Sequence, residues 1–375
     1  MGANLVDIIN AVLEWAGRPA GLHYGALPPV MRTAIGMVIA CGVLLGYVAV
    51  LSLFFGWAER RVAGRMQSRQ GPNRVGAEGI LQMVADGIKL LIKEDIVPAT
   101  AHPVLFRLAP MFVLMGAFAP FVVLPFSENL VVSNMSLGVY YALSFAALEV
   151  VGVIMAGWAS HNKWSLYGGM RLAAQMMSYE IPMGLAMMTV VVLRGSLQVS
   201  HIINDQQGMW ILSWNVFRGF PWALIAAFVF YIAGLAASKR TPFDLPEAES
   251  ELVAGYHTEY SGMRFAMFMM AEYGTMYVIS TLTAILFLGG WHGPLPRAVV
   301  WGTHTYWQAG PILGNAVGAV NLIGKSFVLM FVMLWLRWTF PRVRIDQIIY
   351  ICMKVLVPFG IVCVLGAAVW AIVWP

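Results

Sequence analysis

Long apolar runs recur along the whole of this 375-residue chain and constrain its fold more than any other feature. A helix that crosses the hydrocarbon core of a bilayer needs about 20 predominantly apolar residues. Charged residues make up only 11% of the chain, whereas a soluble domain carries about 25%. The sequence therefore predicts one all-α integral membrane domain over residues 1–375, a bundle of about eight transmembrane helices. The eight runs lie at residues 33–57, 108–126, 135–158, 176–193, 220–237, 265–288, 312–336 and 348–374.

Lysine and arginine residues are distributed unequally between the segments that connect these runs. Segments on one side of the membrane hold only five of the 23. Fifteen lie on the other side, in four loops at residues 58–107, 159–180, 239–261 and 337–347. Cytoplasmic loops carry such an excess of positive charge, so these four loops are predicted to be cytoplasmic and both termini to lie outside. Basic loops beside anionic lipid explain the net charge of +5 without a nucleic-acid partner.

The chain shows none of the sequence patterns by which proteins hold redox cofactors. Its three cysteines, Cys41, Cys352 and Cys363, fall inside predicted spans, and no two form a C-x-x-C pair. Iron–sulfur and zinc sites need closely spaced thiolates, and nucleotide sites need glycine-rich fingerprints that we do not find. We therefore expect no cofactor to be bound by this chain alone, and we expect electron carriers to belong to partner subunits.

A polar cluster follows the first apolar run directly. Trp57 at the predicted membrane border precedes Glu59, Arg60 and Arg61, and Arg65 comes one turn later. Any single arginine at this position is explained as a flank that anchors the helix in its orientation. Because the cluster exceeds that need, we interpret Glu59 and Arg60 as residues that meet the polar headgroup of a lipid-soluble ligand.

Residues 79–94 of the first cytoplasmic loop have the pattern of an amphipathic helix. Gln82, Asp86, Lys89 and Lys93 follow one another at spacings of four, three and four residues, so they share one narrow stripe of a helix. An ion pair between Asp86 and Lys89 on an interfacial helix would explain the stripe. The stripe is too narrow for a freely solvated helix, so Asp86 is also a candidate functional residue.

The cytoplasmic loop at residues 239–261 is unusually acidic. Asp244 can cap a short helix, with Glu247 closing a capping box. That local role does not explain Glu249, Glu251 and Glu259 beside them. Clustered carboxylates repel one another, so some of them are expected to bind and release protons near neutral pH.

Glu149 lies near the middle of the third apolar run, with apolar neighbours on both sides. An acid at the centre of a bilayer costs about 2.5–3.5 kcal/mol on insertion scales, so such acids are rare without a role. Glu149 is either a protonated acid that hydrogen-bonds a neighbouring helix or a station of a proton relay. Glu180 in the next run favours the relay, whereas Glu272 in the sixth run receives no role.

Two long segments, GILQMVADGIKLLIKE and PFDLPEAESELVAG, closely resemble the signature segments of the H-subunit family of complex I, the proton-pumping NADH:quinone oxidoreductase. ERRVAGRMQSRQGPNRVG and GYHTEYSGMRFAMFMMAEY also resemble that family, and the resemblance extends from about residue 51 to residue 346. The family fold, a bundle of eight spanning helices, agrees with the eight runs counted above. The first thirty or so residues and residues 291–320 match no pattern, and we assign them no role.

The resemblance implies a subunit that forms, with peripheral redox subunits, a chamber into which quinone enters from the membrane. The residues that match its lining are Glu59, Arg60, Arg61, Arg65, Phe243, Asp244, Arg337 and Arg342. A chain of carboxylates is implied to lead from the chamber towards antiporter-like membrane subunits, at Asp86, Glu149, Glu180, Glu247, Glu249, Glu251 and Glu259. Quinone would be the substrate, and flavin and iron–sulfur clusters would reside in partner subunits. The chain would not be catalytic alone and would lie in a bacterial inner membrane, or alternatively an organellar one.

Two other functions are compatible with parts of the sequence. One is the homologous anchor subunit of a membrane-bound hydrogenase, or of a dehydrogenase with another electron donor. The other is a free-standing ion transporter, which the intramembrane acids Glu149 and Glu272 would suit. The sequence shows neither an internal repeat nor the paired broken helices that many transporters have, so the transporter is the weaker alternative.

Overall fold

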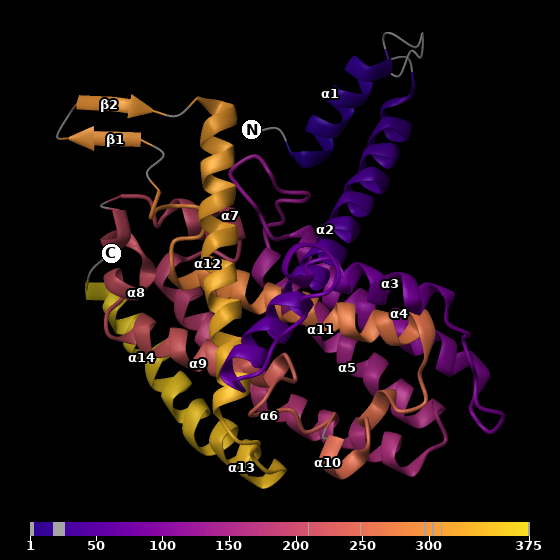
Figure 1. The fold of residues 1–375 in the computed structure, drawn as a ribbon. Helices are drawn as coiled ribbons and strands as arrows, with labels where there is room; N and C mark the ends of the chain where they lie inside the picture. The colour runs from indigo at the N-terminus through magenta and orange to yellow at the C-terminus, as the bar shows by residue number, and fades with distance from the viewer. Residues whose placement is uncertain are drawn as a thin grey trace.

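Long apolar helices make up most of the computed structural model, which describes residues 4–17, 27–208, 210–247, 249–295, 298–301, 304–308 and 310–373 (Figure 1). Seven helical segments in these residues are long and apolar enough to cross a membrane. The predicted all-α integral membrane fold is confirmed. The segments are α2 (Pro29–Met66), α4 with η3 (Pro103–Phe118 and Ala119–Val122), α5 (Gly138–Ala159), α6 (Lys163–Arg194), α11 (Gly262–Phe287), α12 (Pro311–Thr339) and the run of α13, η6 and α14 (Ile345–Tyr350, Ile351–Leu356 and Val357–Val373).

The fifth predicted run differs from the others because it forms only the shorter apolar helix α9 (Trp222–Ala237). Its 16 residues rise about 24 Å, less than the roughly 30 Å of a hydrocarbon core. The helix begins after Pro221, and it ends just before two consecutive cations, Lys239 and Arg240. The predicted number of eight spans is therefore reached only when this short helix is included.

Two long helices extend beyond the predicted borders of their apolar runs. Helix α2 continues to Met66, so residues 59–65 form its last turns rather than the start of a loop. Helix α6 begins at Lys163, because Asn162 caps it by accepting a hydrogen bond from the Trp164 amide at 2.9 Å. Hydrophobicity alone missed both extensions, because the helical backbone continues through polar residues whose side chains find hydrogen-bond partners on a neighbouring element. The predicted end of the last span at Trp374 lies outside the described residues.

Short elements fill the connections. Helix α3 (Gln82–Ile92) matches the amphipathic helix predicted within residues 79–94. A two-stranded antiparallel hairpin, formed by β1 (Ala298–Trp301) and β2 (His304–Gln308), was not expected from the sequence. The others are α1 (Leu5–Gly17), η2 (Ala77–Gly79), α7 (Val199–Asn204), η4 (Trp210–Ser213), α8 (Asn215–Arg218), α10 (Glu249–Leu252) and η5 (Gly255–His257).

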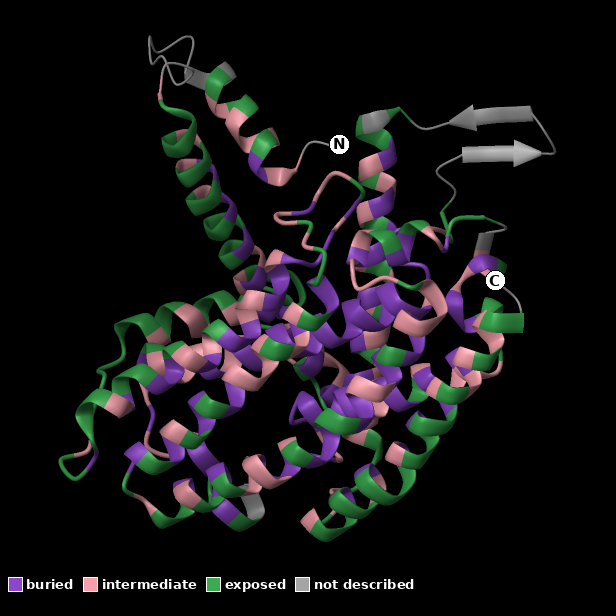
Figure 2. Cartoon of the chain, turned by 180° about the vertical axis from the view of Figure 1, so that it is seen from behind, coloured by how far each residue is buried: buried purple, intermediate pink, exposed green. Residues whose placement is uncertain are grey.

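Helix α11 lies at the centre of the bundle and is almost wholly buried (Figure 2). It packs against α2, α4, α9 and α12. The outer helices α2 and α14 instead expose large apolar side chains such as Val38, Val50, Leu365 and Val369. Exposed apolar surface of this extent is suited to contact with lipid or with a partner subunit.

Glycines allow α4 and α5 to approach each other closely. A Cβ atom added at Gly116 would lie 2.4 Å from the backbone nitrogen of Glu149, and one at Gly152 would lie 2.7 Å from that of Val113. Small residues at helix contacts are the usual means of close packing in membranes. Here they place the backbone of Glu149 directly against α4.

The ends of the bundle differ in character. Helix α1 and the hairpin lie at one end, whereas α10 and α13 lie at the opposite end, together with the loop that follows α9 (Figure 1). Gln175 on α6 fixes the start of this loop, because its amide donates to the carbonyl oxygens of Ala236 at 2.8 Å and Phe243 at 2.9 Å. The loop is therefore pinned into the bundle, and its first side chains point into the protein.

Candidate functional site

The first two charged residues of this loop, Lys239 and Arg240, are buried between the helices, with 2% and 3% of their surface exposed. A charge removed from water is stable only when it is paired and hydrogen-bonded. Each of these cations meets its own acid from a different part of the bundle. The consecutive pair therefore organises a charge network inside the membrane domain.

Arg240 bridges acids of two helices. Its Nη1 donates to both carboxylate oxygens of Glu59 on α2 at 3.0 Å, and its Nε lies 2.6 Å from Glu272 Oε1 on α11. The guanidinium also lies over the ring of Tyr273, 4.7 Å from its centroid. Burial would lower the pKa of Arg240, but the charges of Glu272 and Glu59 outweigh it and hold the pKa well above the usual value.

Glu59 accepts from three side chains in all. Besides Arg240, the Tyr273 hydroxyl donates to its Oε2 at 2.8 Å, and Arg337 in the last turn of α12 donates to its Oε1. The sequence placed Glu59 at the membrane border. The structure buries it between two arginines, because α2 continues past this residue as a helix packed against α11 and α12.

Lys239 makes the second half of the network. Its Nζ lies 2.6 Å from Glu149 Oε1 in the middle of α5, and the Thr275 hydroxyl on α11 donates to Glu149 Oε2 at 2.7 Å. The ammonium also lies 5.4 Å from the ring centroid of Tyr256, whose hydroxyl donates to Glu247 Oε1 at 2.6 Å. Burial would lower the pKa of Lys239, but Glu149 and Glu247 outweigh it and raise the pKa.

Helix α11 connects the two halves. Glu272 and Thr275 are three residues apart, so they lie on the same face of the helix, one turn from each other. Glu272 meets Arg240, and Thr275 meets the acid that pairs with Lys239. One turn of α11 therefore joins the contacts made by the C-terminal parts of α2 and α12 to the contacts in the middle of α5.

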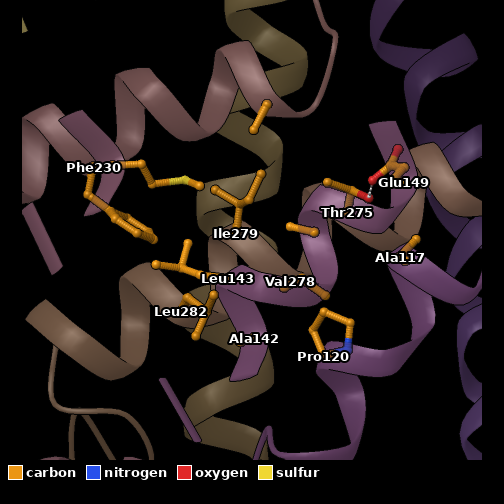
Figure 3. Close-up of a pocket in the computed structure, with 14 residues that line it drawn as sticks. Ala117, Pro120, Ala142, Leu143, Glu149, Phe230, Thr275, Val278, Ile279 and Leu282 are labelled. Atoms are coloured by element: carbon orange, nitrogen blue, oxygen red, sulfur yellow. Dashed lines mark hydrogen bonds between the residues drawn. The ribbon is translucent and has the colours of Figure 1, made fainter. Parts of the chain in front are cut away.

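A small cavity adjoins Glu149 (Figure 3). Its volume is about 30 Å³, room for about two water molecules. Glu149 and Thr275 supply polar groups on one side, and apolar side chains such as Phe230, Leu143 and Leu282 line the rest. The acid thus faces a pocket that is large enough for water yet mostly apolar.

Other predicted chamber residues lie near the C-terminal ends of α2 and α12 and in the loop after α9. Phe243 is buried, and Asp244 Oδ2 lies 3.5 Å from Nη2 of Arg342. Arg61 donates to the Glu78 carboxylate at 2.5 Å. Arg65 is exposed near the end of α2.

Asp86 on α3 pairs with Arg60 Nη1 at 2.7 Å and with Lys89 Nζ at 3.5 Å. The ion pair expected along the stripe therefore forms, and a second cation from α2 joins it. Burial raises the pKa of Asp86, but the hydrogen bond and charge of Arg60, together with Lys89, lower it overall. Asp86 consequently remains ionised and fixes α3 to the C-terminal part of α2.

The remaining acids of the predicted relay lie apart from the buried pair of cations. Glu259 accepts from the Asn162 amide at 2.7 Å, and Glu251 accepts from Arg171 at 2.5 Å in a pair that is half exposed. Glu180 is exposed on the surface of α6. Glu249 belongs to α10, but its side chain lies outside the described residues.

Sequence reasoning assigned no site role to Lys239, Arg240, Tyr256 and Tyr273, and it left Glu272 unassigned. The two cations were counted as a positive flank of the preceding span. A signal was present, because the chain carries two consecutive cations at the end of one apolar run and single acids inside three others. Which acid meets which cation depends on helix packing, and a single sequence does not show that packing.

The fold defines a multi-pass membrane protein, and several of its ion pairs are buried inside the helix bundle. Residues 39–368 match the NADH dehydrogenase family. The chain is 46% identical to the H subunit of NADH-quinone oxidoreductase from Anaeromyxobacter dehalogenans, over 90% of this chain and 82% of the relative. It is 42% identical to the H subunit from Chlorobium luteolum, over 98% and 96% of the two chains, and 43% identical to that from Chlorobaculum tepidum, over 96% and 97%.

The chain thus belongs to the H-subunit family of NADH-quinone oxidoreductase, and the expectation from the signature segments is confirmed. Its relatives are named as subunits of an enzyme complex, so partner subunits are implied. Among the described residues, no group of three or more histidine, cysteine or acidic side chains could hold a metal ion.

Proposed function

We propose that this chain forms the quinone-access chamber of a respiratory NADH:quinone oxidoreductase and carries part of the route that couples quinone reduction to proton translocation. The observation that supports the proposal most strongly is the buried charge network. It begins at the inner ends of α2 and α12, where Glu59 meets Arg337, and it reaches Glu149 in the middle of α5. A structural ion pair would not need to extend so far into the bundle.

The chamber end of this route has the chemistry that a quinone headgroup requires. A quinone carbonyl needs hydrogen-bond donors at the membrane border, and Arg60 and Arg65 are exposed there at the end of α2. Arg61, Phe243, Asp244, Arg337 and Arg342 are proposed to complete the lining at the inner ends of the helices. Asp86 is proposed to act at this entrance by holding Arg60, since its lowered pKa keeps it ionised.

The relay end leads from the loop acids to the membrane. We propose that Glu247 and Glu149 are successive stations, with Tyr256 and Lys239 between them. An exposed acid in a spanning helix is costly against lipid, so Glu180 is proposed to face a partner membrane subunit of the antiporter-like type. Glu249, Glu251 and Glu259 are proposed to extend the route along the loop.

Three further assignments complete the proposal. The complex would lie in a bacterial inner membrane, with both termini of this chain outside, as the excess of lysine and arginine in four loops suggests. Flavin and iron–sulfur clusters would belong to partner subunits, so this chain would not be catalytic alone. Purification of the tagged chain in mild detergent should recover a large assembly with flavin and iron–sulfur absorbance, and recovery of a lone transporter would contradict the proposal.

The relay is tested at Glu149 in the assembled complex. Glu149→Gln keeps the shape and hydrogen-bonding capacity of the side chain but cannot titrate, whereas Glu149→Asp titrates with a shorter reach. The Gln variant should lose proton pumping while NADH still reduces a soluble artificial acceptor, and the Asp variant should retain a good part of pumping. Normal pumping by an assembled Gln variant would show that Glu149 only joins helices and that protons take another path.

A further inference from the structure

Lys239 occupies a backbone position that a lysine rarely adopts. It follows the C-cap of α9 with φ of 55°, and its N–H donates to the carbonyl oxygen of Ala236 at 3.3 Å. Glycine is the usual residue at such a left-handed helix end, because a Cβ is strained there. Strain that persists at a buried residue indicates that its side chain is needed where the backbone places it.

The Lys239 side chain lies between acids of three elements. Glu149 of α5 forms the ion pair at 2.6 Å, and the charges of Glu247 in the loop and Glu272 on α11 also act on the ammonium. Tyr256 offers its ring face to the ammonium and binds Glu247 through its hydroxyl. The ammonium can therefore pair with either of two acids, Glu149 or Glu247.

Other groups near this pair limit what either acid can do. Glu272 already pairs with Arg240. Tyr179 on α6 lies within the electrostatic influence of Glu149 and Glu180. On the α4 side, Glu149 faces the backbone at Gly116 rather than a charge. In the described network, Lys239 is the cation in direct contact with Glu149.

The charges of this network are balanced by ion pairs. Three buried acids, Glu59, Glu149 and Glu272, are paired with Lys239, Arg240 and Arg337. A proton added to Glu149 would leave one positive charge in excess. The excess charge would lie on the Lys239 ammonium. Glu247, a nearby carboxylate outside these pairs, could then pair with it.

We propose that Lys239 is a positioning residue that holds Glu149 ionised, and that Glu149 accepts a proton when the ammonium turns towards Glu247. The inference rests on the proposed function, in which protons pass through Glu149. Lys239 stays protonated throughout. A proton from the loop side binds a carboxylate oxygen of Glu149 while the flexible four-carbon stem moves the ammonium to the second acid. Return of the ammonium makes the neutral acid release its proton, because a nearby opposite charge favours the charged form.

The test measures the protonation of Glu149 directly in the purified complex. Infrared difference spectra recorded over a pH series show the C=O stretch of a protonated carboxyl group, and the band that disappears in Glu149→Gln is assigned to this residue. In Lys239→Gln that band should persist to a pH at least about one unit higher, since an opposite charge at this distance shifts a carboxyl by about 1–3 units. Lys239→Arg, which keeps the charge, should titrate near the wild-type pH, and so should the exposed control Lys163→Gln.

An unchanged titration in Lys239→Gln would overturn the inference, and so would a shift of the same size in Lys239→Arg. Proton pumping by Lys239→Gln should be lost at neutral pH and recover as the pH is raised. A shifted titration with normal pumping would leave the ion-pair role intact and refute the proposed route through Glu149. If Lys239→Gln fails to assemble, assembly should return when Glu149→Gln is added, because the double variant leaves neither charge unpaired. Failure of that rescue would count against the pairing.

Discussion

The close approach of α4 and α5 gives a prediction whose magnitude follows from the structure. In Gly116→Ala the new Cβ would lie 2.4 Å from the backbone nitrogen of Glu149, whereas ordinary contact begins near 3.4 Å. The two helices must therefore separate by about 1 Å, and overpacking of this kind costs about 1–3 kcal/mol. Alanine regains about 1 kcal/mol through helix propensity, so the net loss of stability is up to about 2 kcal/mol.

The same displacement should affect function. The part of the displacement that α5 takes up would lengthen the 2.7 Å hydrogen bond from Thr275 on α11 to Glu149. Membrane complexes unfold irreversibly, so stability is measured as the half-life of the assembled complex at fixed temperature. We expect this half-life to shorten by up to about 30-fold, with reduced proton pumping. Gly184→Ala on α6 is the matched control, since its Cβ would meet nothing within 4 Å. Equal behaviour of the two variants would refute the reasoning.

Three further predictions concern the loops at residues 58–107 and 239–261. Arg60→Ala should weaken quinone reduction while NADH still reduces a soluble acceptor, since a hydrogen bond from a charged donor contributes about 1.5–3 kcal/mol. The exposed Arg74→Ala is the control. Equal loss of both activities would indicate failed assembly. Glu247→Gln should reduce pumping strongly. Glu251→Gln should stay within about twofold of wild type, because Glu251 is half exposed and water can carry the proton past it. The reverse order would contradict the relay. Asp86 has a lowered pKa, so its stabilising contribution is complete above the usual carboxyl pKa of about 3.9 and is lost only as the pH falls through the folded value. Asp86→Asn should consequently shorten the half-life of the complex equally between about pH 6 and 8, and a loss that varies across this range would argue against the assignment.

The sequence predicted those features that depend on local pattern. Apolar length identified the spanning helices, and the spacing of Gln82, Asp86 and Lys89 identified α3. Glu149 was recognised because an acid in an apolar run is costly whatever its surroundings. Each of these conclusions needs only the residues of one segment, so a single sequence is sufficient to reach it.

Features that depend on contacts between segments could not be predicted in the same way. Lys239 and Arg240 resemble the positive flank of any spanning helix, and only the packing of α5, α9 and α11 shows that they are buried against acids. The surface position of Glu180 depends on which face of α6 its neighbours cover.

The two ends of α11 show which parts of this network are free to move. At the N-terminal end Arg264 lies 2.8 Å from Asp95, and near the middle Arg240 holds Glu272. At the C-terminal end Lys325 of α12 donates to the carbonyl oxygens of Leu288, Gly290 and His292. A cation at the C-terminal end of a helix also meets the negative end of its dipole. A buried helix that is fixed at both ends is rigid. A change of charge inside the bundle must therefore be accommodated by movement of side chains or of the loop after α9. That loop carries the strained backbone of Lys239, and the flexible stem of this residue makes it the element of the network best able to respond.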